Sequence, residues 1–382
     1  MNLKVLQVIP KMGYGGAETG CYDLAHFLAE QECKSYIVTS GGELLKFIKK
    51  DKVKIFKLPV QTKNPILIFF NSIMISIIVL FYKIDIVHAR SRAPAWSCFF
   101  SCLITRRKFV TTFHGTYNFS SLIKKFYNSV MTKSTLIIAG SNFIFDHINQ
   151  NYKSAFKKKK KLMVIFRGIN LEYFNPENIS EKNKTQLQLD WKIDPSKKII
   201  LLPGRLTEWK GQEMFIEALN ILVEDYNKSD FQAIILGSNQ GRNVYSKKLL
   251  GLVERYQLLK KIIFVNHCKE MPNAYALSDI VVSSSIEPEA FGRVSVEAQA
   301  MKKPIVASNI GGSKETILNE KSGFLFEYGD PRKLANRLNK MMELDKEALY
   351  SIGNEGRKNV IKKFDVDKMC QTTFVEYKKL FK

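Results

Sequence analysis

The sequence predicts an α/β protein made of two doubly wound domains in tandem. Short apolar segments rich in Ile and Val recur along the chain, helical patterns separate them, and the alternation restarts after a polar stretch at 175–186. Strands that alternate with helices imply parallel sheets joined by right-handed crossovers. We therefore expect a first domain at 1–178 and a second at 179–363, with a C-terminal helix (364–382) that packs back on the first domain.

The expected strands are the short apolar runs that precede a turn and a helix. In the first domain they lie at 3–9, 34–40, 85–89, 108–114, 135–141 and 162–166. In the second domain they lie at 198–205, 231–237, 261–266, 279–285 and 304–308. Ligands of such sheets bind beyond the carboxyl ends of the strands, so the residues that follow each strand are the candidate site residues.

Charge is distributed unevenly along the chain. The net charge is +23, and residues 1–180 hold 26 Lys and Arg against 10 Asp and Glu. A basic half of this kind favours anionic partners, such as a phospholipid surface or a phosphorylated glycolipid. The sequence contains no recognisable nucleic-acid motif, so we expect no nucleic-acid partner. The basic run at 156–161 is interpreted as a solvated loop, with a membrane-contact loop as the alternative.

Cysteine usage and the amino-terminal sequence indicate a cytoplasmic protein. The six cysteines form no C-x-x-C pair and the five histidines are scattered, so neither a zinc site nor a disulfide framework is expected, and most cysteines should be buried. The chain moves directly into a strand at residue 3, without a signal-peptide pattern. We expect a cytoplasmic location, with peripheral binding to the inner face of the plasma membrane.

The segment ILIFFNSIMISIIVLFY (66–82) has 17 residues and no charge. This length is at the lower edge for a membrane-spanning helix. A core strand is expected at 85–89, directly after it, and a spanning helix would divide one domain between two sides of a membrane. We therefore expect a helix that is buried or that lies on a membrane surface, and no span.

GYGGAETG (13–20) follows the first expected strand. A dinucleotide fingerprint requires a third glycine where Glu18 stands, so the pattern disfavours an NAD-dependent oxidoreductase. Gly15 and Gly16 allow a ligand to approach the backbone closely, and the helix that begins behind them attracts anions. A plain turn between strand and helix is the alternative.

FHGTY (113–117) and HARSRAP (88–94) end two further strands of the first domain. His114 is placed to reach a ligand, although a lone histidine is more often structural. Arg90 and Arg92 are placed to meet an anionic group, and we add Tyr117 as a candidate acceptor-binding residue.

PGRLTEWKGQ (203–212) ends the first strand of the second domain. Arg205 offers a planar fork of donors and Lys210 a point charge, a combination that suits a diphosphate. The alternative is a pair of solvent-exposed cations. Their place between a buried strand and a helix favours the binding role.

SSSIEPEAFGRVSVEAQAM (283–301) places two carboxylates eight residues apart, in the loop and in the helix after a buried strand. Glu289 and Glu297 can accept hydrogen bonds from the hydroxyls of two sugars, such as a hexose and a ribose. The backbone N–H groups of Phe291, Gly292 and Arg293 are expected to point at a phosphate from the start of the helix. The alternative for Glu297 is a favourable interaction with the helix dipole.

These motifs together resemble a known family. EAFGRVSVE (289–297) is an E-x7-E motif, and with GRLTEWKG, GGAE and FHG it resembles the retaining glycosyltransferases of the GT-B fold, family 4. The resemblance covers essentially the whole chain. HARSRAPAW, TTFHGTY and GRLTEWKGQ are similar to bacterial members that build lipopolysaccharide or surface polysaccharide.

The resemblance implies two Rossmann-like domains that face each other across a cleft, with the donor on the second and the acceptor on the first. It implies that Glu289 binds the transferred sugar, that Glu297 binds the ribose, and that the donor site comprises Gly15, Gly16, Arg205, Lys210, Glu289, Phe291, Gly292, Arg293 and Glu297. The expected catalytic residues are His114, Glu289, Arg205 and Lys210, and the expected acceptor-binding residues are Arg90, Arg92, His114 and Tyr117.

The function that follows is transfer of a sugar from a nucleotide-diphosphate donor to a glycan or lipid-linked acceptor, with retention and without a metal or cofactor. The expected partners are the nucleotide sugar, the acceptor and an anionic membrane surface. The alternatives are a sugar-nucleotide epimerase of the same fold, a relative of the glycan phosphorylases and synthases, and a non-catalytic protein that binds anionic lipid.

Overall fold

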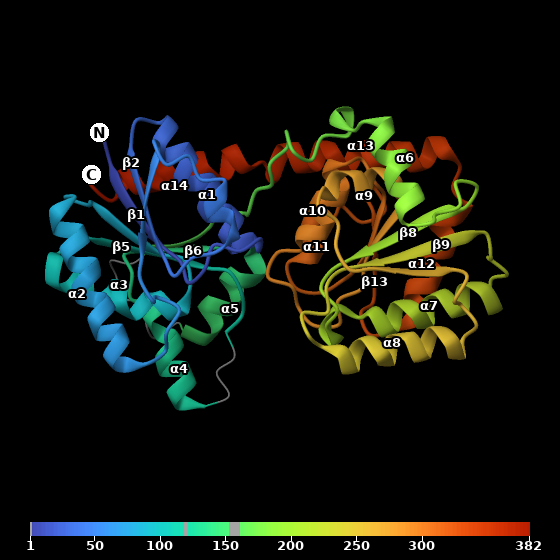
Figure 1. Cartoon of the computed structure of the whole chain (residues 1–382), viewed down its shortest axis with the longest axis horizontal. Coiled ribbons are helices and arrows are strands. Elements are labelled where there is room, and N and C mark those ends of the chain that lie inside the picture. The colour runs from blue at the N-terminus through green and yellow to red at the C-terminus, as the bar shows by residue number, and fades with distance from the viewer. Residues whose placement is uncertain (1, 118–120, 153–160) are drawn as a thin grey trace. The chain divides into compact units, whose positions relative to one another are not determined.

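The chain folds into two compact units. A computed structural model describes residues 2–117, 121–152 and 161–382. Unit 1 comprises residues 1–168 and 366–382, and unit 2 comprises residues 169–365 (Figure 1). The chain leaves unit 1 at Gly168, earlier than the predicted boundary at 178. Of the basic run at 156–161, only Lys161 lies within the described residues.

Unit 1 contains a seven-stranded sheet in which every strand pair is parallel. In sheet order its strands are β3 (Val53–Lys57), β2 (Lys34–Thr39), β1 (Lys4–Val8), β4 (Ile86–Ala89), β5 (Lys108–Phe113), β6 (Leu136–Ala139) and β7 (Lys161–Val164). The direction of winding reverses between β1 and β4. The ends of these two strands therefore flank the position where doubly wound sheets bind ligands.

Helices cover both faces of this sheet (Figure 1). They are α1 (Gly16–Glu30) and α14 (Val366–Lys379) on one face, and α2 (Pro65–Phe81), α3 (Arg92–Thr105), α4 (Leu122–Ser129) and α5 (Asn142–Tyr152) toward the other. The C-terminal helix α14 packs beside α1. Its Phe374 and Tyr377 are buried in one cluster with Leu24 and Leu28 of α1, so unit 1 buries its first helix only with the help of the last.

Unit 2 contains a six-stranded sheet, again with parallel pairs only. In sheet order its strands are β10 (Ile262–Val265), β9 (Phe231–Leu236), β8 (Lys198–Pro203), β11 (Ile280–Ser283), β12 (Ile305–Ser308) and β13 (Phe324–Phe326). Here the winding reverses between β8 and β11. The two motifs expected to bind the donor follow these two strands.

The helices of unit 2 also form two layers (Figure 1). They are α7 (Gln212–Glu224), α8 (Asn243–Arg255) and α12 (Pro331–Glu343) on one face, and α6 (Glu181–Asp190), α9 (Met271–Leu277), α10 (Arg293–Ala300), α11 (Ser313–Thr316) and α13 (Lys346–Lys363) on the other. A continuous apolar core joins β8, β9 and β11 to α7 and α12. The polar stretch at 175–186 is not a bare linker, because much of it forms the start of α6.

The predicted fold class is confirmed: both units are doubly wound α/β sheets. Each predicted strand has its counterpart, and the structure adds the edge strands β3 and β13. All six cysteines are free thiols and five are buried, as predicted.

The apolar segment predicted at 66–82 forms α2, and the buried interpretation fails for its outer face. Phe69 is 65% exposed and Phe81 is 77% exposed, whereas Ile75 and Val79 are fully buried. Within the described part of the chain, no helix has both the length and the apolar content that crossing a bilayer demands.

Candidate active site

The loop after β8 holds the two predicted diphosphate-binding cations of unit 2. The 3-10 turn Glu208–Lys210 ends at Gly211, whose φ of +69° lies in the left-handed region that favours glycine. A Cβ atom at Gly211 would lie 2.0 Å from the carbonyl oxygen of Ser284, in the loop after β11. The Ser284 hydroxyl also donates to the carbonyl oxygens of Lys210 and Gly211, at 3.0 and 3.1 Å. The backbone N–H of Ile286 donates to the Trp209 carbonyl at 2.9 Å, so the two predicted motifs are also joined backbone to backbone.

Lys210 and Glu289 form an ion pair at this junction. The Lys210 Nζ lies 2.7 Å from Glu289 Oε1, and both side chains are largely buried. Ser285 donates its hydroxyl proton to the same oxygen at 2.6 Å, and the ammonium lies 4.5 Å from the ring centre of Trp209. Burial alone would raise the pKa of Glu289, but the Lys210 charge and the hydrogen bonds from Lys210 and serine hydroxyls outweigh it and hold the pKa below its ordinary value. Glu289 is therefore ionised at neutral pH.

Arg205 has a different environment. Its side chain is exposed and forms no hydrogen bond or ion pair within the described ranges. Its backbone is held in place, because Gln212 Nε2 donates to the Arg205 carbonyl at 2.9 Å and Tyr245 in turn donates to Gln212 at 3.2 Å. A fixed backbone that carries a free guanidinium is suited to capture an anion.

Three glycines let the loop 289–292 pack directly on the turn after β12. Gly292 has a φ of +88° and caps α10, and a Cβ atom there would lie 2.7 Å from Ser313 Cα. Gly311 has a φ of +60°, and a Cβ atom at Gly312 would lie 2.6 Å from the Ala290 carbonyl. Gly312 N–H donates to the Glu289 carbonyl at 2.7 Å. This packing fixes the backbone that carries Glu289 at the start of α10.

Phe291 points into the core rather than toward a ligand. It is 3% exposed and packs edge-on against Phe364, with ring centres 5.5 Å apart. Any contact with a donor must therefore come from its backbone. Phe291 thus anchors the loop, and the phosphate-binding role predicted for this stretch rests on the start of α10, at Gly292 and Arg293.

Glu297, the second carboxylate of the motif, is 6% exposed and fully engaged. Tyr275 donates its hydroxyl proton to Oε2 at 2.7 Å, and the Arg293 guanidinium pairs with Oε1. Burial and the neighbouring Glu297 charge raise the pKa of Tyr275 well above its ordinary value, which keeps the phenol a donor. Binding of a ribose by Glu297 therefore requires Arg293, whose side chain is 36% exposed, to release this oxygen.

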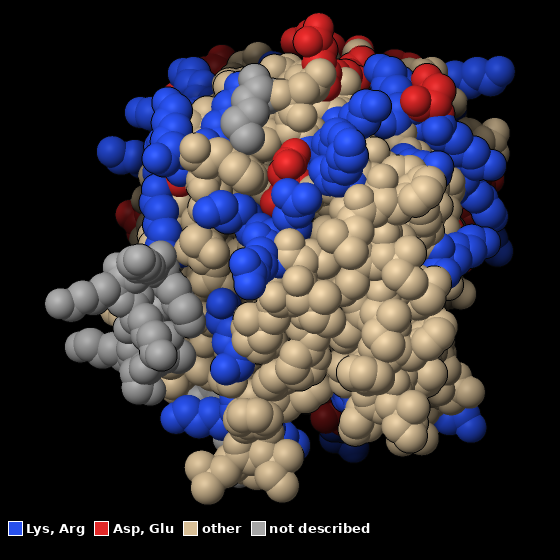
Figure 2. Space-filling model, turned by 90° about the vertical axis from the view of Figure 1, so that its left-hand side faces the viewer, with Lys and Arg blue, Asp and Glu red and all other residues tan. Residues whose placement is uncertain are grey.

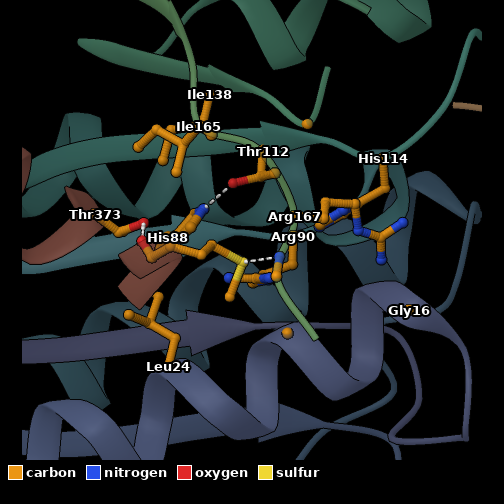
Figure 3. Close-up of a pocket in the computed structure, with 14 residues that line it drawn as sticks. Gly16, Leu24, His88, Arg90, Thr112, His114, Ile138, Ile165, Arg167 and Thr373 are labelled. Atoms are coloured by element: carbon orange, nitrogen blue, oxygen red, sulfur yellow. Dashed lines mark hydrogen bonds between the residues drawn. The ribbon is translucent and has the colours of Figure 1, made fainter. Parts of the chain in front are cut away.

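In unit 1, His114 and Arg90 line a pocket beyond the ends of β4 and β5 (Figure 3). Both ring nitrogens of His114 are buried without a hydrogen-bond partner in the described chain. Burial, with the charges of Arg167 and Arg90, lowers the pKa of His114 well below its ordinary value, so the imidazole is neutral. Arg90 is 5% exposed and donates to Gln7 Oε1 at 3.1 Å, which leaves its Nε buried without a partner.

Arg167 also lines this pocket, although no sequence motif predicted a role for it. It comes from the segment after β7 and reaches the start of α1, where a Cβ atom at Gly16 would lie 2.4 Å from its guanidinium (Figure 3). Gly15 is the N-cap of α1, and the Glu18 carboxylate folds back over it. Gly15 and Gly16 therefore do permit a close approach, but in this structure it is made by the protein's own side chains.

Arg92 and Tyr117 support the rim of the pocket. The Arg92 guanidinium lies 4.4 Å from the Tyr117 ring centre and donates to Asn128 Oδ1 at 3.1 Å. Tyr117 stacks on Phe113, and burial raises its pKa to about 12. Tyr117, Arg90 and His114 line a second hollow next to the first, whereas Arg92 lines neither hollow and contacts the Tyr117 ring.

Beneath the pocket, His88 is buried and neutral. Its two ring nitrogens are 2.6 Å from the Tyr377 hydroxyl and 2.7 Å from Thr112 Oγ1 (Figure 3). Burial lowers the pKa of His88 well below its ordinary value, with a smaller effect from Arg90. His88 therefore ties β4 to β5 and to the C-terminal helix. Among the described residues no group of three or more His, Cys, Asp or Glu side chains is arranged to hold a metal ion.

Two doubly wound units, each with polar and cationic side chains after the strands at its switch point, have the architecture of the GT-B fold. The family described as "Glycosyl transferases group 1" matches residues 183–359, and "Glycosyltransferase Family 4" matches residues 14–173. A crystallised glycosyltransferase from Rickettsia africae ESF-5 is 36% identical, with coverage of 100% of this chain and 99% of that one and a TM-score of 0.91. The chain belongs to the group 1 glycosyltransferases, as its motifs predicted.

More distant relatives agree with this assignment. The capsular polysaccharide biosynthesis glycosyltransferase CapM of Staphylococcus aureus is 24% identical over 351 residues, 88% of each chain. The fold is shared with HepE of Anabaena, solved in complex with UDP and glucose, which is 22% identical with a TM-score of 0.82 and coverage of 98% and 99%.

Proposed function

We propose that this glycosyltransferase moves a sugar from a nucleoside-diphosphate donor to a glycan or lipid-linked acceptor, in the synthesis of cell-envelope polysaccharide or lipopolysaccharide. The observation that carries the donor half is the buried Lys210–Glu289 pair beside the free guanidinium of Arg205, at the switch point of unit 2. The names of the relatives support the rest: one is a glycosyltransferase of capsular polysaccharide biosynthesis, and another was solved with UDP and glucose.

In the proposed donor complex, the diphosphate takes the place of Glu289 as the partner of Lys210. Arg205 closes on the same diphosphate, and the N–H groups at the start of α10 face it. Glu289, released from Lys210 but still bonded to Ser285, accepts hydrogen bonds from the hydroxyls of the transferred sugar. Glu297 accepts the ribose hydroxyls once Arg293 moves aside. The Lys210–Glu289 ion pair is then the arrangement without a ligand. Donor binding replaces it with two contacts, one between Lys210 and the diphosphate and one between Glu289 and the sugar hydroxyls.

The proposed reaction is a front-face displacement with retention. The bond between the anomeric carbon and the diphosphate oxygen breaks through an oxocarbenium-like state, and Arg205 and Lys210 stabilise the charge that grows on the leaving group. The acceptor oxygen bonds to the anomeric carbon from the same face, and its proton passes to the departing phosphate oxygen. Glu289 is not a nucleophile here, so a trapped covalent glycosyl-enzyme would contradict this route. We propose that the cations suffice without a metal, so EDTA should leave the rate unchanged.

The acceptor half of the proposal places the acceptor in unit 1. Arg90, Arg167 and neutral His114 gather at a pocket there, and Tyr117 lines the adjoining hollow. Two guanidinium groups favour an acceptor with a phosphate or carboxylate, and a neutral imidazole can hydrogen-bond to a sugar hydroxyl. The excess of positive charge in residues 1–180 fits an acceptor held at an anionic membrane. We propose a cytoplasmic enzyme that binds peripherally to the inner face of the plasma membrane.

The first test is thermal stabilisation by a panel of nucleoside diphosphates (UDP, GDP, ADP and CDP). A ligand at 100 times its Kd should stabilise unit 2 by roughly 2.7 kcal/mol. We expect one base to raise the Tm of the wild type and of Lys248→Ala, and to leave Lys210→Ala unchanged. Lys248 is the matched control, because it also pairs with a glutamate in unit 2, at 2.6 Å, but on the exposed surface.

The identity of the product then separates transfer from epimerisation. With the donor that the panel identifies, a transferase releases the nucleoside diphosphate only when an acceptor is present or water replaces it. An epimerase would return a new sugar nucleotide and no free diphosphate. Stabilisation that does not depend on Lys210 would contradict the proposed donor site.

A further inference from the structure

The helix α2 presents apolar side chains to solvent, while its three polar side chains face the protein together with Ile68, Ile75, Ile78 and Val79. Asn71, Ser72 and Ser76 are buried and hydrogen-bonded: Asn71 donates to the Pro59 carbonyl at 3.1 Å, and Ser76 to Ser101 of α3 at 3.1 Å. The exposed stripe consists of Ile66, Leu67, Phe69, Phe70, Ile73, Ile77, Leu80 and Phe81, with exposed fractions between 39% and 77%. A helix on an aqueous surface has the opposite arrangement.

Two neighbouring helices extend this apolar surface. On α3, Leu103 and Ile104 are 60% and 62% exposed and Phe100 is 39% exposed. On α4, the exposed apolar side chains are Leu122, Ile123 and Phe126, at 85%, 81% and 65%. Helix α3 packs along α2, and its Trp96 contacts Phe126 of α4, with ring centres 5.4 Å apart. We call these fourteen exposed side chains on α2, α3 and α4 the apolar face. Its size indicates an interaction surface rather than scattered exposed side chains.

The surroundings of the apolar face are basic. Residues 52–145 hold 13 Lys and Arg and a single acid, Asp85. Asp85 is used internally, because its carboxylate accepts the Lys4 N–H at 2.9 Å. Figure 2 shows a broad surface without charge, with Lys and Arg gathered along its borders. Lys63 and Lys83, both exposed, stand just outside the two ends of α2.

We propose that the apolar face is a membrane-docking surface: α2 and α4 insert their apolar side chains among the acyl chains of an anionic bilayer, and the bordering cations bind lipid phosphates. An apolar face with a basic border matches an anionic leaflet, because the apolar side chains suit the acyl chains and the cations suit the anionic headgroups. A second copy of the chain fits less well, because a two-fold contact would bring the same cations together with no acid to meet them. This inference rests on the proposed function, because it identifies the surface through which the enzyme binds the membrane. Its test measures vesicle binding and does not depend on sugar transfer.

Vesicle binding by matched variants tests this surface. Vesicles of phosphatidylcholine alone are compared with vesicles of phosphatidylcholine and phosphatidylglycerol in equal parts, by co-sedimentation of the full chain. The face variants are Phe69→Ser/Phe81→Ser on α2 and Leu122→Ser/Ile123→Ser on α4. The control is Leu189→Ser/Val244→Ser, two side chains of unit 2 with similar exposure, 68% and 86%. The charge variant is Lys63→Gln/Lys83→Gln.

The wild type and the control should bind the anionic vesicles strongly and the neutral ones weakly. Each face variant should raise the Kd for anionic vesicles by about tenfold, and the charge variant should weaken binding mainly at low salt. All variants should keep the nucleotide-induced Tm shift, since the exchanged side chains are exposed and none of them belongs to the proposed donor site. A missing shift in every protein, wild type included, would speak against the donor proposal and leave vesicle binding to decide this one.

Two results would overturn the docking surface. One is vesicle binding that is absent, or that is equal in the face variants and the control. The other is a concentration-dependent dimer in lipid-free buffer, measured by analytical ultracentrifugation, that the face variants dissociate while no protein binds vesicles. The apolar face would then be an interface between copies of this chain.

Discussion

At the scale of single residues, the donor motif depends on one buried ion pair, between the Lys210 ammonium and the Glu289 carboxylate. The position of Lys210 and Glu289 after two strands could be predicted, because both follow apolar runs in the sequence. Their pairing with each other could not, since it depends on the register that brings the β8 and β11 loops together. The partners Ser285 and Tyr275 were missed for the same reason, as hydroxyl side chains carry no pattern that reveals a tertiary contact.

Removing the Lys210 ammonium should destabilise the fold in a pH-dependent manner. The folded-state pKa of Glu289 is lowered, so the pair contributes stability above the ordinary carboxyl pKa, and this contribution is lost as pH falls through the folded pKa. In Lys210→Met the buried carboxylate has no counter-charge. We expect a loss of about 3 kcal/mol in the free energy of unfolding at pH 7, which shrinks toward pH 4 where Glu289 takes up a proton.

Urea denaturation of both proteins at pH 7 and pH 4 measures this difference. Lys248→Met serves as the control, because the Lys248 side chain is 57% exposed and water screens its ion pair with Glu213. A deficit for Lys210→Met that is equal at both pH values would contradict an ionised pair.

His88 also makes unit 1 less stable as pH falls, but at a higher pH than Glu289 does in unit 2. A histidine held neutral in the folded state binds a proton only after unfolding, so its contribution to stability is present above the unfolded pKa and is lost as pH falls below about 6.5. We expect His88→Gln to be less stable than the wild type at pH 8 and to lose less stability between pH 8 and pH 5. Chemical denaturation at both pH values tests this, and equal slopes in the two proteins would count against a neutral His88.

At the scale of elements, the central strands and the edge strands β7 and β10 were predictable, whereas the edge strands β3 and β13 were not. Buried parallel strands are near-continuous apolar runs, whereas β3 (VKIFK) alternates charged and apolar residues and β13 has only three residues. The helix over 66–82 was predicted by its composition, but its outward apolar face was not. Every position on that helix is either apolar or small and polar, so the sequence alone does not distinguish its two faces.

The turn at Gly211 joins the two donor motifs and should not accept a side chain. Gly211→Ala would strain the backbone and place a methyl group 2.0 Å from the Ser284 carbonyl. Gly241 is a matched control, because its φ of +83° also disfavours alanine but the space around it is open. We expect Gly241→Ala to cost about 1 kcal/mol and Gly211→Ala at least about 2 kcal/mol more.

The nucleotide-induced Tm shift should separate these two glycine variants as well. Gly211→Ala moves the backbone of Lys210 and should lose the shift, while Gly241→Ala should keep it. Two variants with equal stability and equal nucleotide response would show that the loops after β8 and β11 are not rigidly joined.

At the scale of the whole molecule, the two units rest on separate cores, and unit 1 depends on both ends of the chain. The core of unit 2 lies entirely within residues 169–365, whereas that of unit 1 includes Cys370, Phe374 and Tyr377 of α14. The pattern of elements along the sequence predicted that the last helix packs on the first domain. The residue at which the chain passes from unit 2 back to unit 1, after Asp365, is defined only by the structure, in which α14 contacts α1.

Removal of residues 366–382 should therefore unfold unit 1 and spare unit 2. The deletion exposes Leu24, Leu28 and Ile138 and removes the Tyr377 hydroxyl that holds His88. Differential scanning calorimetry should show the unit 1 transition lost or shifted far below that of the full chain. The unit 2 transition should remain and should still rise with the nucleoside diphosphate that stabilises the wild type. If both transitions disappear together, the two units fold as one cooperative body, and the donor site cannot be assigned to unit 2 alone.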